Sequence, residues 1–237
     1  PRCAPTSTQE QLSAASQLLR EYPSIHLHTH LSETKEEINW VNSLFPDCKS
    51  YLNVYEHAGL LRRRSTLAHC LHLTETDWKI LRDKECSVAF CPSSNLFLGS
   101  GLFDLPRAQA VDVNLGIGTD VGAGTSLSIL QTISDAYKTQ RLAGNDLSPF
   151  SALYMATLGG AKSLDCEADI GNFKIGKEAD FIVLDPESTP IMRYRKQHCE
   201  SLHEMLFGIA LLGDDRAVSA TYANGQCVHR RDSDEKV

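Results

Sequence analysis

The stretch that decides the fold is Ile25-His26-Leu27-His28-Thr29-His30-Leu31-Ser32-Glu33, a short alternating segment that ends in a polar turn. Its alternation of side chains predicts a β-strand over 25–30. Apolar residues at helical intervals predict a helix on each side of it, at 9–21 and 34–45. Thr34 and Glu37 form a capping-box pattern at the start of the second helix. The segment therefore reads as a strand between two helices.

The same alternation continues along the chain. Short apolar runs predict further strands over 65–70, 87–92 and 114–120. Helical spacing predicts helices between and after them, over 74–84, 103–110, 126–142 and 148–164. The stretch that follows residue 92 is rich in Ser, Asn and Gly and reads as a loop. Strand–helix alternation of this kind indicates right-handed βαβ units and a parallel sheet, so the fold class is α/β.

The pattern changes after about residue 165. Residues 171–186 read as a glycine turn followed by a buried strand, and 219–231 as two short strands around Asn224-Gly225, a strong hairpin signal. We therefore divide the chain into an α/β part, 1–164, and a smaller part, 165–237, that carries a C-terminal helix and β-structure. The last residues, 230–237, read as a solvated tail.

Composition excludes several classes of protein. The 237 residues carry 23 Lys and Arg against 30 Asp and Glu, a formal net charge of −7, which argues against nucleic acid or anionic membrane as partner. The longest apolar run, 205–212, is too short to span a bilayer. Eight cysteines without a CxxC pair indicate reduced thiols and a cytoplasmic location. Because the sequence begins at Pro1 rather than Met, we expect a fragment or a processed product.

Three predicted strands end in side chains that bind metals or exchange protons: His30, His69 and Asp120. The carboxyl ends of parallel strands meet at one edge of a sheet, so these groups are expected to converge. Two imidazoles and a carboxylate form a typical ligand set for Zn²⁺. His26 and His28 share the face of His30 at other depths, and we expect them to be buried or layer-filling residues with local hydrogen bonds.

Two further motifs were weighed at this edge. Glu33 follows His30 by three residues and fits either a first-turn acid or a general acid/base beside a metal. The glycines after Asp120 suggest a phosphate loop, but no Lys precedes Thr125, and Gly116-x-Gly118 lacks a third glycine. No HxE with PCxxC and no GxSxG segment occurs, which excludes the cytidine-deaminase type of zinc site and a serine nucleophile elbow.

Several segments together resemble the amidohydrolase superfamily and, within it, the bacterial-type guanine deaminases. They are His30-Leu31-Ser32-Glu33, Ala68-His69, Phe90-Cys91-Pro92-Ser93-Ser94-Asn95-Leu96, 97–105, Gly118-Thr119-Asp120-Val121-Gly122-Ala123-Gly124, 156–161, 171–173 and 176–181. The resemblance covers roughly residues 1–225. It implies a (β/α)8 TIM barrel, of which this chain supplies the C-terminal half, strands five to eight, plus part of a small β-sandwich.

The resemblance also implies roles for individual residues. His30 and Asp120 would be zinc ligands, His69 would face the zinc-bound water, and Glu33 would shuttle the proton. Pro1-Arg2-Cys3 resembles a segment that contacts the purine, but Cys3 replaces an aromatic residue there. The expected substrate-binding residues are Arg2, Cys3, His30, Leu31, Ser32 and Glu33.

The implied reaction is zinc-dependent hydrolysis of guanine to xanthine and ammonia, in purine catabolism, with guanine as the small-molecule partner. The family's first-strand His-x-His pair has no counterpart here, because His26-Leu27-His28 has the right letters but lies on the wrong strand. Two more zinc ligands are therefore expected upstream, and the chain alone is expected to be inactive. Two alternatives stay open: another amidohydrolase acting on a related ring amine or chloride, and a non-catalytic truncated chain that pairs with another subunit. The chain is also a possible homodimer.

Overall fold

The computed structural model describes residues 1–231, and most of the tail expected at 230–237 lies outside them. The strands are β1 (Leu27–Leu31), β2 (Ser65–His69), β3 (Ser87–Phe90), β4 (Asn114–Ile117), β5 (Phe181–Leu184), β6 (Val218–Ala223) and β7 (Gln226–Arg230). The α-helices are α1 (Gln9–Glu21), α2 (Lys35–Leu44), α3 (Tyr51–His57), α4 (Glu75–Asp83), α5 (Pro92–Leu98), α6 (Leu105–Val111), α7 (Ile129–Leu142), α8 (Pro149–Ala156), α9 (Leu158–Ser163), α10 (Pro190–Lys196) and α11 (Leu202–Leu212). Residues 1–231 also contain two 3₁₀ turns, η1 (Ala4–Thr6) and η2 (Asp215–Ala217).

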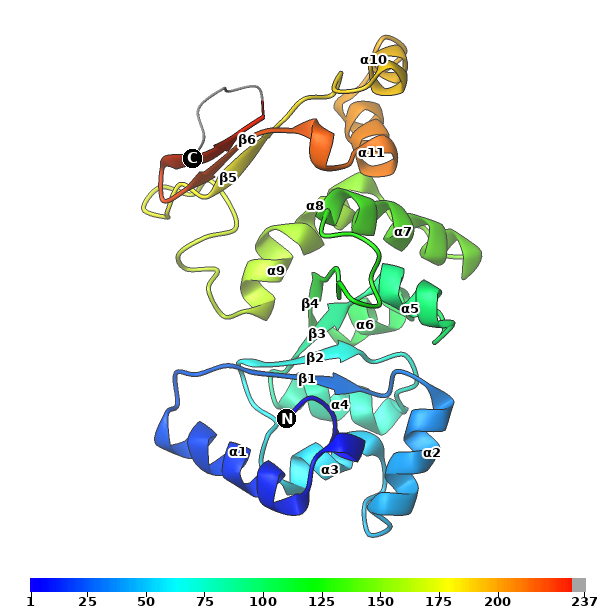
Figure 1. Ribbon diagram of the computed structural model, residues 1–237, viewed down its shortest axis with the longest axis vertical. Helices are drawn as coiled ribbons and strands as arrows, with labels where there is room; N and C mark the ends of the chain where they lie inside the picture. Colours follow the sequence, from blue (N-terminus) through cyan, green and yellow to red (C-terminus); the bar gives the residue numbers. More distant parts are fainter. Residues whose placement is uncertain (232–237) are drawn as a thin grey trace.

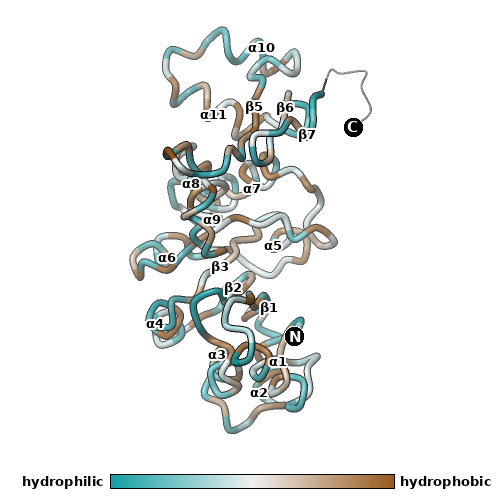
Figure 2. The backbone as a smooth tube through the Cα atoms, turned by 90° about the vertical axis from the view of Figure 1, so that its left-hand side faces the viewer, coloured by the Kyte–Doolittle hydropathy of each residue, from teal (hydrophilic) through white to brown (hydrophobic). Residues whose placement is uncertain are grey.

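The elements follow the long axis of the molecule in chain order. Helices α1 to α4 lie at one end beside β1 and β2, and the antiparallel strands with α10 and α11 lie at the other (Figure 1). The view at right angles shows the same elongated arrangement (Figure 2). In the described part of the chain, 1–231, no helix is long and apolar enough to cross a membrane.

The first sheet is parallel, as the alternating pattern predicts. Its strand order is β1-β2-β3-β4, with Leu31 opposite His69 and Phe90 opposite Ile117. Every residue of β2 is buried, as expected for a parallel strand covered on both faces. The expected strand over 114–120 ends early, at Ile117, so Asp120 lies in the loop that follows it.

Two helices of the α/β part were not expected from the sequence. Helix α3 was missed, and α5 occupies a stretch that reads as a loop because it is short and rich in serine. In α5 the polar residues Ser93, Ser94 and Asn95 are buried, and the Ser93 hydroxyl donates a hydrogen bond to Asp135 Oδ2 over 2.7 Å. Tertiary contacts thus hold a helix that local composition disfavours.

The helix expected over 148–164 is two helices, α8 and α9, that meet at Thr157. Helix α9 packs closely against β4. A Cβ atom at Gly159 would lie 2.9 Å from the Leu115 carbonyl oxygen, and one at Gly116 would lie 3.2 Å from Gly160 Cα. The glycines therefore allow backbone-to-backbone packing that a continuous helix with larger side chains could not make.

The C-terminal sheet is antiparallel, in the order β5-β6-β7. The β6–β7 hairpin predicted at Asn224-Gly225 is present, with φ values of 47° and 75° that suit a type I′ turn. The prediction that the strand within 171–186 is buried is wrong: Ile182 and Val183 of β5 are 48% and 43% exposed. Strand β5 lies at the edge of a three-stranded sheet and has a neighbouring strand on one side only. Its apolar residues are therefore only partly covered.

Helix α11 joins the C-terminal part to the α/β part. It packs against α7 and α8, with the rings of Phe207 and Tyr137 5.1 Å apart. The Ser134 hydroxyl of α7 also donates a hydrogen bond to the Leu211 carbonyl. The apolar run 205–212 is therefore a helix that packs partly on the α/β part. All eight cysteines have free thiols, as expected.

Candidate metal and catalytic site

The chain turns sharply where three parallel strands end. Ser32, directly after β1, has φ of 50°, His69, the last residue of β2, has 71°, and Asp120 beyond β4 has 46°. Left-handed backbone at non-glycine residues costs about 1–3 kcal/mol each and persists only where surrounding structure fixes it. Ser32, His69 and Asp120 share one edge of the sheet, whereas Arg64, Glu85 and Asp112, which also have positive φ, lie ahead of the strands at the other edge.

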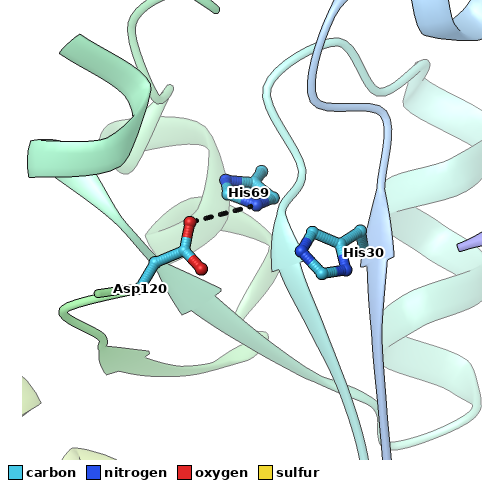
Figure 3. A group of neighbouring side chains, drawn as sticks. All are labelled: His30, His69 and Asp120. Carbon is cyan, nitrogen blue, oxygen red and sulfur yellow. Dashed lines mark ion pairs between the residues drawn. The ribbon is translucent and has the colours of Figure 1, made fainter. Parts of the chain in front are cut away.

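His30, His69 and Asp120 converge at this edge. Their potential ligand atoms all lie within 4.8 Å of one another. The side chains come from β1, β2 and the loop after β4 and point toward a common region (Figure 3). His69 is fully buried, whereas His30 and Asp120 are partly exposed. The parallel register sets this geometry, because it aligns the ends of β1 and β2.

Each histidine directs one ring nitrogen into the cluster. His30 Nδ1 donates a hydrogen bond to the Arg2 carbonyl over 2.8 Å, and His69 Nδ1 lies 2.8 Å from Asn95 Oδ1, to which it donates. Each Nε2 then carries the lone pair that a metal ion requires. His69 Nε2 is buried and has no hydrogen-bond partner. A buried polar atom of this kind needs a partner, so the donor set fits a cation such as Zn²⁺.

Two carboxylates face His69 Nε2. Glu33 Oε2 lies 3.6 Å from it and Asp120 Oδ2 lies 3.7 Å from it. The Ser100 hydroxyl donates to Glu33 Oε1 over 3.2 Å, and the Ser100 carbonyl accepts a hydrogen bond from His72 Nε2. Glu33 is thus held beside the cluster without being one of its three converging groups.

The N-terminal segment lies against the same strand end. The Arg2 carbonyl accepts hydrogen bonds from the His30 amide, the His30 ring and the Thr29 hydroxyl, at 3.0, 2.8 and 2.9 Å. This places the exposed Arg2 side chain and the buried Cys3 beside Glu33. These residues line a cavity of about 370 Å³ with His30, Thr34, Glu36, Glu37 and Trp40, among others.

Leu31 and Ser32 are absent from the lining of that cavity. The Leu31 side chain is fully buried in the hydrophobic core, because it points to the opposite face of β1 from His30. Ser32 is also buried, and its carbonyl accepts hydrogen bonds from the Leu71 and His72 amides. Neither residue lines the cavity, and the Ser32 backbone holds the turn at the strand end.

The prediction that His26 and His28 are buried is wrong. Both are exposed, since His26 precedes β1 and His28 lies on the open face of the sheet. The protein still desolvates the His28 ring enough to lower its pKa, and His30 acts in the same direction.

Cys91 lies close to the cluster but is not one of its three converging groups. Burial raises the pKa of its thiol to about 12, and the nearby Asp120 carboxylate acts in the same direction. The free thiol therefore stays protonated near neutral pH.

Sequence reasoning missed several residues that surround the site: Asn95, Ser100, Glu37 and Trp40. Asn95 lies in a segment interpreted as a loop, and Ser100 reaches Glu33 across 67 residues of sequence. Glu37 was noted only as a helix cap. The one available signal was the polar character of 93–95, which is unusual beside an apolar strand.

Comparison with known proteins decides the family. The amidohydrolase family model matches residues 1–228. The chain belongs to the amidohydrolase family. The resemblance drawn from the site motifs is thereby confirmed, and the cluster at the strand ends lies within the matched region of this amidohydrolase.

The similar proteins include several named guanine deaminases. The chain is 50% identical to the guanine deaminase of Escherichia coli over 231 residues, which is 98% of this chain and 53% of that protein. The solved E. coli structure superposes with a TM-score of 0.96 and covers 98% of this chain and 54% of its own. The guanine deaminase of C. acetobutylicum, solved with guanine in its active site, has a TM-score of 0.85 at 28% identity, covering 97% and 54%. The chain thus spans about half the length of these relatives.

Proposed function

We propose that this chain is part of a zinc-dependent guanine deaminase that hydrolyses guanine to xanthine and ammonia. The observation that carries the proposal is the unpartnered, buried His69 Nε2, which faces Glu33 and Asp120 beside His30. The similarity to proteins named guanine deaminase supports the choice of substrate, since one of them was solved with bound guanine.

We also propose that the parallel sheet is the C-terminal half of a (β/α)8 barrel, its strands five to eight. Consecutive parallel strands in the order β1-β2-β3-β4, without a reversal, support a singly wound barrel rather than a doubly wound sheet. The chain covers 54% of the E. coli structure. In this proposal residues 1–164 form the partial barrel, and 165–237 contribute α11 and part of a β-sandwich.

His30 and Asp120 would hold the zinc ion, with two further histidines from the length of the relatives that this chain does not cover. Bound zinc would act as a Lewis acid and lower the pKa of water from roughly 15.7 to about 7. Structural sites with four ligands bind zinc with about 10–16 kcal/mol. Since this chain offers half of the proposed ligand set, residues 1–237 alone are expected to bind zinc weakly and to be inactive.

The side chains of this chain would divide the proton transfers. His69 Nε2 accepts a hydrogen bond from the attacking water and orients it, and Asp120 accepts the proton that the water loses. That proton passes through Glu33 to a ring nitrogen of guanine as the C–O bond forms. Glu33 then carries the proton of the new hydroxyl to the amine, so that the C–N bond breaks, a C=O bond remains and ammonia leaves. The Arg2 guanidinium donates to purine acceptor atoms, as arginine does to guanine O6 and N7 elsewhere.

The proposal extends to partners and location. A free purine base is the expected partner, rather than nucleic acid or membrane lipid. Eight free thiols support a cytoplasmic location. Light scattering of the purified protein tests the possible homodimer.

The deciding experiment measures ammonia release by the protein expressed from its natural reading frame, loaded with zinc, on guanine, adenine, cytosine and chlorinated triazines. We expect turnover of guanine above the other substrates. Absence of guanine turnover, or a preference for a triazine, would refute the proposed substrate. The same assay on purified residues 1–237 tests the expected inactivity, which stoichiometric zinc and guanine turnover would contradict.

A further inference from the structure

Two buried tyrosines on α3 have hydroxyl groups that the proposed chemistry does not use. Tyr51 and Tyr55 lie one helical turn apart and are 1% and 0% exposed. A buried tyrosine hydroxyl requires hydrogen-bond partners, and its choice of partners shows what it holds in place. Here the partners belong to the two chain segments that approach the cavity.

The first contacts hold the N-terminal segment. The Ala4 amide donates to both hydroxyls, at 2.9 Å to Tyr55 and 3.2 Å to Tyr51. The Tyr55 hydroxyl in turn donates to the His30 carbonyl over 2.8 Å. The segment that carries Arg2 and Cys3 is thereby fixed to α3 and to the strand of His30.

The second contacts reach Glu33 through Glu37. The Tyr51 hydroxyl donates to Glu37 Oε1 over 3.0 Å, and Glu37 Oε2 accepts the Glu33 amide over 3.0 Å. Burial raises the pKa of Tyr51 far above its usual range, so its hydroxyl remains a donor at working pH. Hydrogen bonds to a carboxylate are generally stronger than neutral ones, although at 3.0 Å this bond is not one of the short ones.

The role of Glu37 goes beyond helix capping. In a full capping box its carboxylate would accept the amide of the N-cap residue Thr34. Only half of that box forms here: the Thr34 hydroxyl accepts the Glu37 amide, while the carboxylate bonds to Glu33, one residue earlier. By contrast, Thr74 and Asp77 form a complete box at the start of α4. Glu37 is thus directed to the backbone of Glu33.

We propose that Tyr51 and Glu37 are positioning residues, which fix the backbone of Glu33 relative to the purine-binding segment Pro1–Thr6. This inference rests on the proposed deaminase function and deepens it. One hydrogen-bonded path, Ala4–Tyr51–Glu37–Glu33, joins the part that binds the ring to the part that moves the proton. Displacing a reacting group by about 1 Å can cost about 10²-fold in rate, so this path sets the distance on which proton transfer depends.

The first test compares Glu37→Ala with Glu37→Gln in the natural-length protein. Alanine removes both contacts, so we expect kcat on guanine to fall about tenfold or more while the zinc content is unchanged. Glutamine keeps both contacts, since its oxygen accepts the Glu33 amide and its NH₂ donates to the Tyr51 hydroxyl. We expect kcat of that variant within about threefold of wild type.

Matched controls separate positioning from stability. Gln11→Ala breaks the complete capping box that Thr8 and Gln11 form at the start of α1, and is expected to lower the melting temperature without lowering kcat. Tyr51→Phe is expected to lower kcat as Glu37→Ala does. Tyr55 does not contact Glu37 but accepts the Ala4 amide, so Tyr55→Phe is expected mainly to raise KM for guanine.

The outcomes distinguish this inference from the function on which it rests. Wild-type protein without guanine turnover would defeat the proposed function and this inference with it. Wild-type turnover would leave the function intact, and the inference alone would fail if Glu37→Ala kept kcat within twofold of wild type. The inference would also fail if Glu37→Gln and Glu37→Ala lowered kcat equally, since a purely structural role or a role of the charge alone would give equal losses.

Discussion

Replacing Glu33 with glutamine tests the proposed proton transfer most directly. The two side chains have the same shape, so the Ser100 hydroxyl can still donate to the oxygen at Oε1 over 3.2 Å. The change removes the group that accepts and releases a proton 3.6 Å from His69 Nε2. Since Glu33 is not one of the three converging groups His30, His69 and Asp120, the zinc content is expected to stay as in wild type.

The size of the effect follows from the role. General acid–base catalysis contributes about 10²–10⁴-fold, which is about 2.7–5.4 kcal/mol of barrier. Ser100→Ala removes only one hydrogen bond to the carboxylate, a loss of about 1.5 kcal/mol or roughly tenfold. We therefore expect kcat to decrease in the order wild type, Ser100→Ala, Glu33→Gln.

The assay is steady-state ammonia release from guanine, with zinc measured by elemental analysis on the same samples. Glu10→Gln, an exposed carboxylate on α1, is the control and should behave as wild type. If Glu33→Gln kept more than a tenth of wild-type kcat, the assignment of Glu33 as proton carrier would be refuted. A loss of zinc in that variant would instead show that Glu33 is a ligand.

Three further predictions concern the metal, the purine and pH. His30→Ala should lower zinc stoichiometry in elemental analysis, whereas His26→Ala, which removes an exposed histidine ahead of the same strand, should not. Arg2→Ala should raise KM for guanine by about tenfold or more with a smaller change in kcat, and an unchanged KM would contradict its contact with the purine. Burial raises the pKa of the Cys86 and Cys91 thiols from 9.0 to about 12, so the unfolded chain releases these protons first. The stability that these protonated thiols confer is complete below pH 9. The free energy of unfolding should then fall by about 1.4 kcal/mol per thiol for each pH unit up to about 12. Urea unfolding at pH 8 and 10 measures this fall, which should be smaller in a Cys91→Ala variant.

Much of the α/β part could be predicted because its signals are local. Hydrophobic periodicity gave the four parallel strands, and the capping signals gave the start of α2 near Thr34. The positions of His30, His69 and Asp120 were accessible for the same reason, since parallel strands place their carboxyl ends together. The β6–β7 hairpin was equally accessible through Asn224-Gly225.

The errors share a physical cause, which is that burial is decided by neighbours. His28 alternates correctly within β1 yet lies on an open face, and the apolar β5 is only partly covered. Helix α5 forms although its sequence is polar, because Ser93 bonds to Asp135 and Asn95 bonds to His69. Periodicity reports which side chains share a face but not what covers that face.

The sequence by itself determined the α/β class, the parallel character of the sheet and the residue types at the strand ends, because these follow from local spacing and from the alternation of strands and helices. Only the tertiary structure decided which nitrogen of His69 is left without a partner, which hydroxyl holds Glu33, and how Tyr51 and Glu37 join two segments. Those contacts link residues 26, 67 and 47 positions apart in His69–Asn95, Glu33–Ser100 and Ala4–Tyr51. Hydrogen bonds form within about 3 Å, a distance that the packing of the whole chain sets and no local pattern encodes.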